Sequence, residues 1–203
     1  SGEYRIYVND ELKKTFNLFV SDEQPKNEIN VLMLGDSILN QNYYSQFFLE
    51  MFEAGKINLL GTLGKDDAKH EGRGGWSAYD YCNETSKYGF SNPFLNPKTN
   101  EFDFSYYMDK NNYDNLDYVI INLGINDLNL YGHNEHNEII SYFDKIANSI
   151  HEFNEDVTII FNTPEMPFAE NKNVGIKNTR LGLITELNNH YSNKEKIYVC
   201  QTH

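Results

Sequence analysis

A serine and an asparagine that could do chemistry each follow an apolar run of the chain. Gly35-Asp36-Ser37 comes directly after residues 29–34, and Gly124-Ile125-Asn126-Asp127 comes directly after residues 116–123. A serine hydroxyl at the end of a strand can attack a carbonyl carbon, and nearby backbone N–H groups and an asparagine amide can stabilise the resulting oxyanion. The plainer alternatives are that Ser37 caps a helix or loop and that Gly-x-Asn-Asp forms a turn.

A glycine-rich segment, Glu71-Gly72-Arg73-Gly74-Gly75-Trp76-Ser77, lies between these two loops in the sequence. Its glycines would let the backbone approach a ligand closely. The spacing is not G-x-G-x-x-G, and we expect no strand to lead directly into the segment, so a dinucleotide-binding loop is excluded. The stretch from Gly75 to Tyr79 also lacks the last glycine of the G-x-S-x-G turn of α/β-hydrolases.

Alternating strands and helices after residue 28 must position these three loops. Such alternation predicts a parallel sheet with helices on both faces, and ligands bind such sheets at the carboxyl ends of the strands. The predicted strands are residues 29–34, 57–60, 116–123, 157–161 and 196–200, and the predicted helices are 43–54, 138–153 and 176–191. We expect the first helix to turn Phe47, Phe48, Met51 and Phe52 toward the core.

The first 28 residues have a different pattern from the rest of the chain. Apolar and polar residues alternate over residues 3–20, with the turn signal Asn9-Asp10 in the middle, which predicts a β-hairpin. The polar stretch 21–28 then reads as a linker. We therefore divide the chain into an N-terminal hairpin extension with its linker, residues 1–28, and a main body, residues 29–203.

Taken together, the three loops resemble the motifs of the SGNH/GDSL hydrolase superfamily. This resemblance covers the chain from about residue 28 onward, and it implies a flavodoxin-like three-layer α/β/α sandwich with a central parallel sheet. It also implies a serine esterase or acylhydrolase that needs no metal or other cofactor. By position, Ser37 resembles the nucleophile. The oxyanion hole would comprise the N–H of Ser37, the N–H of Gly75 (with Gly74 as the alternative) and the side chain of Asn126.

The neighbours of these residues have supporting roles in this interpretation. Asp36 and Asp127 would hold their loops, since a carboxylate can accept backbone N–H bonds. Trp76, next to the predicted oxyanion glycine, would contact the substrate. The long segment 82–115 is rich in aromatic residues, which would either wall the pocket or, as we prefer, pack on the body of the protein.

The Asp-x-x-His block, which in this superfamily follows the fifth strand and supplies the general base, is not found in that region. The one match by spacing, Asp67 to His70, lies upstream of the glycine-rich segment. Because a serine hydroxyl without a base is a poor nucleophile, we expect the chain as given to hydrolyse esters weakly or not at all. Three explanations stay open: the chain is part of a longer one, another histidine is the base, or the domain binds without catalysis.

The remaining histidines have plainer interpretations than catalysis. We expect His70 in an exposed loop, and His151 and His190 at solvated helix ends. His133 and His136, with Glu135 between them, have a spacing that could bind zinc, but the loop-like Gly132-His133-Asn134 favours no metal. His203 is the last residue of the chain.

Composition narrows the possible partners. The chain has 17 basic and 30 acidic residues, a net charge of −13, and this balance argues against nucleic acid or an anionic membrane surface. No apolar run reaches the roughly 20 residues that would span a bilayer. Two cysteines cannot form a disulfide framework.

The expected partner is a small ester or an acetylated glycan. A non-catalytic carbohydrate-binding or cell-surface module and an acyltransferase are the alternatives; a secreted or cell-surface location is favoured, and the oligomeric state is not indicated.

Overall fold

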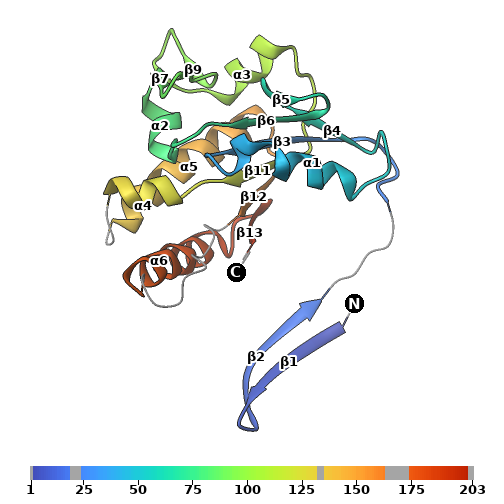
Figure 1. Ribbon diagram of the computed structural model, residues 1–203, viewed down its shortest axis with the longest axis vertical. Helices are drawn as coiled ribbons and strands as arrows, with labels where there is room; N and C mark the ends of the chain where they lie inside the picture. The colour runs from blue at the N-terminus through green and yellow to red at the C-terminus, as the bar shows by residue number, and fades with distance from the viewer. Residues whose placement is uncertain (1, 19–23, 132–134, 163–173, 201–203) are drawn as a thin grey trace.

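A seven-stranded, mostly parallel sheet forms the centre of the body in the computed structural model, which describes residues 2–18, 24–131, 135–162 and 174–200 (Figure 1). Its strand order is β13-β12-β11-β3-β6-β5, with β4 also paired to β3, and only β5 runs antiparallel to its neighbour. The strands are β3 (Ile29–Gly35), β4 (Ile57–Leu60), β5 (Leu63–Lys65), β6 (Ala68–Gly72), β11 (Tyr118–Asn122), β12 (Thr158–Asn162) and β13 (Ile197–Cys200).

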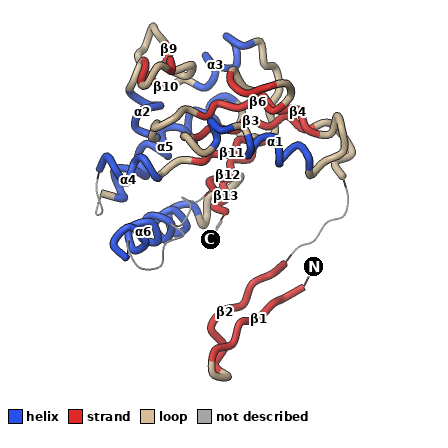
Figure 2. Tube along the Cα trace, viewed as in Figure 1, coloured by secondary structure: helices blue, strands red, loops and turns tan. Residues whose placement is uncertain are grey.

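Helices connect the parallel strands and cover both faces of the sheet (Figure 2). The larger core lies on the face that carries Leu32 and Leu34, and the smaller core lies on the face that carries Val31 and Met33, because successive side chains of a strand point to opposite faces. This burial on both faces explains why β3 is an apolar run apart from Asn30. The helices are η1 (Leu39–Gln41), α1 (Tyr43–Glu50), α2 (Ala78–Asn83), α3 (Phe104–Asn111), α4 (Ile125–Tyr131), α5 (His136–Phe153) and α6 (Val174–Tyr191).

The predicted fold class is confirmed. Each of the five predicted strands and three predicted helices has a counterpart within a few residues. The α/β/α layers follow from the two cores, one on each face of the sheet. None of the helices in the described part of the chain is long and apolar enough to cross a bilayer.

The predicted inner face of α1 is only half right. Phe48 packs against the smaller core, but Phe47 and Met51 are 62% and 64% exposed. The helix buries the side that carries Ser45, Phe48 and Leu49 instead, which are three or four residues apart and so share one face.

The absence of a strand before the glycine-rich segment was predicted wrongly. Strand β6, Ala68–Gly72, pairs antiparallel with β5 and leads directly into that segment. It was missed because its sequence, Ala-Lys-His-Glu-Gly, contains three polar residues, two of which, His70 and Glu71, are buried.

The aromatic segment 82–115 packs mainly on the body of the protein, which is the alternative that the sequence analysis preferred over a pocket wall. Phe94, Phe104 and Tyr107 are fully buried in the larger core. The segment also forms two small antiparallel strand pairs, β7 with β8 and β9 with β10. These short strands are β7 (Ser86–Lys87), β8 (Phe90–Ser91), β9 (Leu95–Asn96) and β10 (Glu101–Phe102).

The predicted N-terminal hairpin is also present. Strands β1 (Gly2–Val8) and β2 (Glu11–Leu18) pair antiparallel and form a two-stranded sheet of their own. Asn9 and Asp10 have φ angles of 49° and 60°, the left-handed values that a tight two-residue hairpin turn requires. Val20 and part of the predicted linker, residues 21–23, lie outside the described residues.

Candidate active site

The sheet register brings the three predicted loops to one level at the carboxyl edge. Gly35 at the end of β3 pairs with Gly72 of β6 on one side and with Asn122 of β11 on the other. Asn122 pairs in turn with Asn162 of β12, which pairs with Cys200 of β13. The strand order changes direction beside β3, which is where α/β sheets of this kind bind ligands. The segments that contain Ser37, Gly75 and Asn126 therefore begin side by side.

The Ser37 loop is a short, well-bonded connection between β3 and η1. Asp36 is buried, and its Oδ1 accepts the N–H of Ile38 at 2.9 Å, while its carbonyl accepts the N–H of Asn40 at 3.0 Å. Ser37, between these bonds, is exposed. This arrangement presents the serine to solvent on a fixed backbone, with Asp36 holding the loop.

The glycine-rich loop is attached to the Ser37 loop by backbone bonds. The N–H of Arg73 donates to the carbonyl of Gly35 at 2.9 Å. A Cβ added at Gly72 would lie 2.7 Å from the backbone nitrogen of Asn40, so only glycine fits there. Gly75 has φ of +76°, in the left-handed region that favours glycine.

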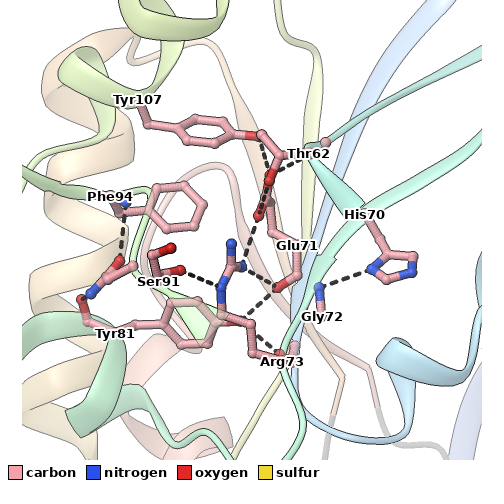
Figure 3. Close-up of polar contacts among 12 residues, drawn as sticks. Thr62, His70, Glu71, Gly72, Arg73, Tyr81, Ser91, Phe94 and Tyr107 are labelled. Atoms are coloured by element: carbon pink, nitrogen blue, oxygen red, sulfur yellow. Dashed lines mark hydrogen bonds and ion pairs between the residues drawn. The ribbon is translucent and has the colours of Figure 1, made fainter. Parts of the chain in front are cut away.

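A buried polar network fixes the base of the glycine-rich loop (Figure 3). The Arg73 guanidinium forms an ion pair with Glu71 at 2.7 Å, and its Nε donates to the carbonyl of Ser91 at 2.9 Å. Glu71 also accepts the backbone N–H of Thr62 and the hydroxyl of Tyr107, at 2.6 and 2.9 Å. Because the charged groups are paired and hydrogen-bonded inside the protein, the network rigidifies the end of β6.

Tyr81 connects the ends of two strands. Its hydroxyl lies within hydrogen-bond distance of the carbonyls of Gly35 and Glu71, at 2.8 and 2.6 Å. Burial, offset in part by the nearby Arg73 charge, raises the pKa of Tyr81 well above its usual range, so the phenol keeps its proton for donation.

Asn126 and Asp127 lie in the first turn of α4 and hold the third loop against the second. The Nδ2 of Asn126 donates to the carbonyl of Trp76 at 2.8 Å. An amide nitrogen has two hydrogens, so a second one is available to a ligand. Oδ1 of the buried Asp127 accepts the N–H groups of Ala78 and Tyr79 at 2.9 and 3.4 Å. Burial raises the pKa of Asp127 to about 6.

The position of Trp76 counts against its predicted contact with substrate. Its side chain is 0% exposed, its ring packs beside Tyr81, and its indole N–H donates to the carbonyl of Lys87 at 3.1 Å. It is a core residue. The exposed aromatic side chain next to Gly75 is Tyr88 instead: a Cβ added at Gly75 would lie 2.8 Å from its ring.

His70 is buried and not in an exposed loop as predicted. Its Nδ1 accepts the N–H of Gly72 at 3.0 Å (Figure 3). Its Nε2 lies 2.6 Å from Oδ1 of Asn42. The ring is therefore neutral, with its proton on Nε2. Burial lowers the pKa of His70 below its ordinary value of 6.5. Both ring nitrogens have partners, so His70 supports the loop and is not placed to deprotonate Ser37.

Two further histidines lie at the opposite edge of the sheet. His151 is in the last turn of α5, where its Nε2 is 3.1 Å from the carbonyl of Val157, just before β12. His190, near the end of α6, pairs with Asp144 at 2.9 Å. Both helices end where the next parallel strand begins, so these rings lie near the amino ends of the strands, away from Ser37.

Of the two histidines whose spacing could bind zinc, the structure describes only His136. His136 begins α5 and packs against Gly182 of α6, whereas His133 lies outside the described residues, as does His203. Among the residues that the structure does describe, no cluster of histidine, cysteine, aspartate and glutamate side chains could hold a metal ion.

Polar side chains continue the carboxyl edge beyond the third loop. The Nδ2 of Asn162 lies 2.6 Å from Oδ1 of Asn122 and 2.7 Å from the hydroxyl of Tyr44. The residues that follow β12 and β13 along this edge, 163–173 and 201–203, lie outside the described residues.

Comparison with known proteins shows which solved structures share the fold of this chain. No protein-family model matches the chain, and no curated protein matches it. A solved serine-to-alanine mutant of an acetyl esterase with an acetate ion has a TM-score of 0.59 and 18% identity, over 85% of this chain and 79% of that one.

Two carbohydrate esterases of family 3 are similar to the chain as well. The enzyme from Clostridium thermocellum has a TM-score of 0.54 and 17% identity over 86% of this chain and 78% of that one. The enzyme from Talaromyces cellulolyticus has a TM-score of 0.52 and 20% identity over 85% and 78%. The chain therefore has the α/β/α fold of these acetyl and carbohydrate esterases, which confirms the fold that the three loop motifs predicted.

Proposed function

We propose that this protein is a serine esterase that removes an acyl group, most simply acetyl, from a small ester or an acetylated carbohydrate. The observation that carries the proposal is the pairing of Gly35 with both Gly72 and Asn122. This register starts the three loops at one level, which supports a common site for the exposed Ser37, the left-handed Gly75 and the amide of Asn126.

In this mechanism Ser37 Oγ attacks the ester carbonyl carbon while a base accepts its proton. The negative charge that develops on the carbonyl oxygen is stabilised by the N–H groups of Ser37 and Gly75 and by the second amide hydrogen of Asn126. The alcohol leaves with a proton, and the acyl group stays on the serine. Water then attacks the acyl-serine and releases the acid. We assign the base to none of His70, His151 and His190, for the reasons of position and bonding given above.

The proposed substrate class rests on two kinds of support. Fold neighbours are named as acetyl and carbohydrate esterases, and the net charge of −13 disfavours a polyanionic substrate. A neutral acetylated sugar or a small acetate ester agrees with the names of the fold neighbours and with the negative charge of the chain.

Acetate release by the wild-type chain and by Ser37→Ala tests the proposal. We expect release that depends on Ser37, even if slow, together with covalent labelling of Ser37 by a fluorophosphonate. Equal rates in the two proteins, with no labelling, would contradict esterase activity.

A non-catalytic carbohydrate-binding module is the second candidate. It is favoured by one observation: His70 has partners on both ring nitrogens, and His151 and His190 lie near the amino ends of the strands. Glycan binding that is unchanged in Ser37→Ala, without acetate release or labelling, would support this candidate.

An acyltransferase would instead show Ser37-dependent transfer of acetyl to an added sugar at the expense of free acetate.

A further inference from the structure

Tyr88 occupies an unusual position beside the predicted oxyanion glycine. It is 72% exposed, the most exposed of the large hydrophobic side chains in the described residues, yet its ring lies directly against Gly75. Phe90, two residues on, lies beside Gly74, where an added Cβ would be 3.8 Å from Phe90 Cε2. Gly74 and Gly75 are therefore flanked by aromatic rings from one small hairpin, β7–β8.

Tyr88 lies in a turn whose backbone conformation favours asparagine, aspartate or glycine over tyrosine. Tyr88 and Gly89 join β7 to β8 with φ angles of 50° and 81°, so both central residues are left-handed. Two-residue turns of this kind prefer asparagine, aspartate or glycine at the first position, and a bulky aromatic there is an outlier. Strained residues of this sort concentrate at functional sites, and the inference runs from the observed outlier to a function.

The backbone beneath Tyr88 is held firmly. The indole N–H of Trp76 donates to the carbonyl of Lys87 at 3.1 Å, and Lys87 Nζ forms an ion pair with the buried Asp80 at 2.7 Å. The same Nζ lies 5.1 Å from the centroid of the Tyr88 ring. The ring is thus held on a fixed turn before any ligand arrives, and such preorganisation lowers the entropic cost of binding.

We infer that Tyr88 is a specificity-determining residue whose ring stacks on the sugar ring of an acetylated glycan. The exposed face of an aromatic ring is electron-rich and attracts the C–H groups that a pyranose presents on its flat face. This inference rests on the proposed function and deepens it, because it names the part of the substrate that is recognised. It also gives the role first predicted for Trp76 to the exposed neighbour of Gly75.

The experiment compares glucose pentaacetate, which has a sugar ring, with ethyl acetate, which has none. In Tyr88→Asn the ring is removed while the turn receives a residue that suits it, so the melting temperature should stay the same or rise. We expect the ratio of kcat/KM for glucose pentaacetate over that for ethyl acetate to fall about 3- to 10-fold, mainly through KM. Tyr88→Phe should keep the wild-type ratio, and so should Tyr7→Asn, which removes an exposed tyrosine from the N-terminal hairpin.

An equal loss on both esters would overturn the inference, since Tyr88 would then act only by supporting Gly75. No change on either ester would overturn it as well. If neither ester is hydrolysed in a Ser37-dependent way, the esterase proposal fails, and binding still decides the role of Tyr88. Saturation-transfer NMR of glucose pentaacetate with Ser37→Ala should then show contact that is lost in Ser37→Ala/Tyr88→Asn; contact that persists would refute the role.

Discussion

Asn126 has its amide oriented before any ligand binds. The bond from Nδ2 to the carbonyl of Trp76 fixes the plane of the amide and thereby the direction of its second hydrogen. Asp127, the next residue, adds bonds to the N–H groups of Ala78 and Tyr79. A donor oriented in this way stabilises a developing charge without having to reorganise during the reaction.

Replacing Asn126 by alanine should therefore reduce turnover far more than stability. We expect Asn126→Ala to lower kcat by about 10²- to 10³-fold, the usual loss for one oxyanion donor. The lost bond to Trp76 should cost only about 1 kcal/mol of unfolding free energy. Steady-state kinetics and urea denaturation measure the two effects. A large loss of stability at an unchanged rate would show that Asn126 is structural only.

His70 should make stability depend on pH. In the folded protein burial lowers its pKa, whereas in the unfolded chain the pKa returns to about 6.5. Below pH 6.5 the unfolded chain therefore binds a proton at His70 more readily than the folded protein does. The contribution of neutral His70 to the free energy of unfolding is complete above pH 6.5 and is lost as the pH falls below that value. Urea denaturation between pH 7 and pH 5 should show a steeper decline for wild type than for His70→Gln.

The glutamine variant keeps a donor for Asn42 but cannot titrate. Asp127, whose pKa is raised to about 6, contributes in the opposite direction, but it does so in both proteins and cancels in the difference. Parallel curves for wild type and His70→Gln would refute the role given to His70.

At the scale of single residues, the sequence indicated which candidate site residues follow a strand, but not which of them are exposed. Ser37 and Asn126 could be selected because each follows a buried strand. Trp76 was selected for substrate contact by its place beside Gly75, whereas its side chain is buried in the larger core. Tyr88 was missed, since nothing in the chain order places residue 88 against residue 75.

At the scale of elements, β6 depends on a buried ion pair. Glu71 is fully buried, and its partner Arg73 is almost so. A pair of this kind adds little over an apolar pair, but removing one member leaves an uncompensated buried charge. The same pair explains why β6 could not be predicted from hydropathy, because charged residues are seldom read as the interior of a sheet.

A double-mutant cycle should reveal this coupling. We expect Arg73→Met alone to destabilise the protein by about 3–5 kcal/mol. Glu71→Gln combined with Arg73→Met should cost clearly less than the sum of the two single changes. Urea denaturation of the four proteins gives the coupling free energy, and strictly additive costs would contradict the role of the pair.

At the scale of the whole molecule, the hairpin and the body are joined by sequence and not by strand pairing. Strands β1 and β2 pair only with each other, while Gln24 and Lys26, after the hairpin, contact Glu53 and Lys56 of the body. Removing residues 1–20 should leave the melting temperature of the body within about 2 °C, because surface changes of this kind have small effects on stability. A larger decrease, measured by circular dichroism, would show that the hairpin supports the body.

The overall fold was predictable because strong local patterns agree with the global arrangement. Buried parallel strands such as β3 and β11 are mostly apolar, and the long helix α5 has a clear apolar stripe. The strand β6, the helix α3 and the exact face of α1 were beyond local pattern, because tertiary contacts and buried polar groups decide them.

Cys200 ends β13 in the same register row as Gly35, and it is exposed, whereas Cys82 is buried and burial raises the pKa of its thiol to about 12. A maleimide dye at neutral pH should therefore react with Cys200 alone. The wild-type chain thus carries its own attachment point for a fluorophore on the carboxyl edge of the sheet. Ligand arrival there could be followed by emission, without introducing a cysteine and without waiting for a substrate to be cleaved.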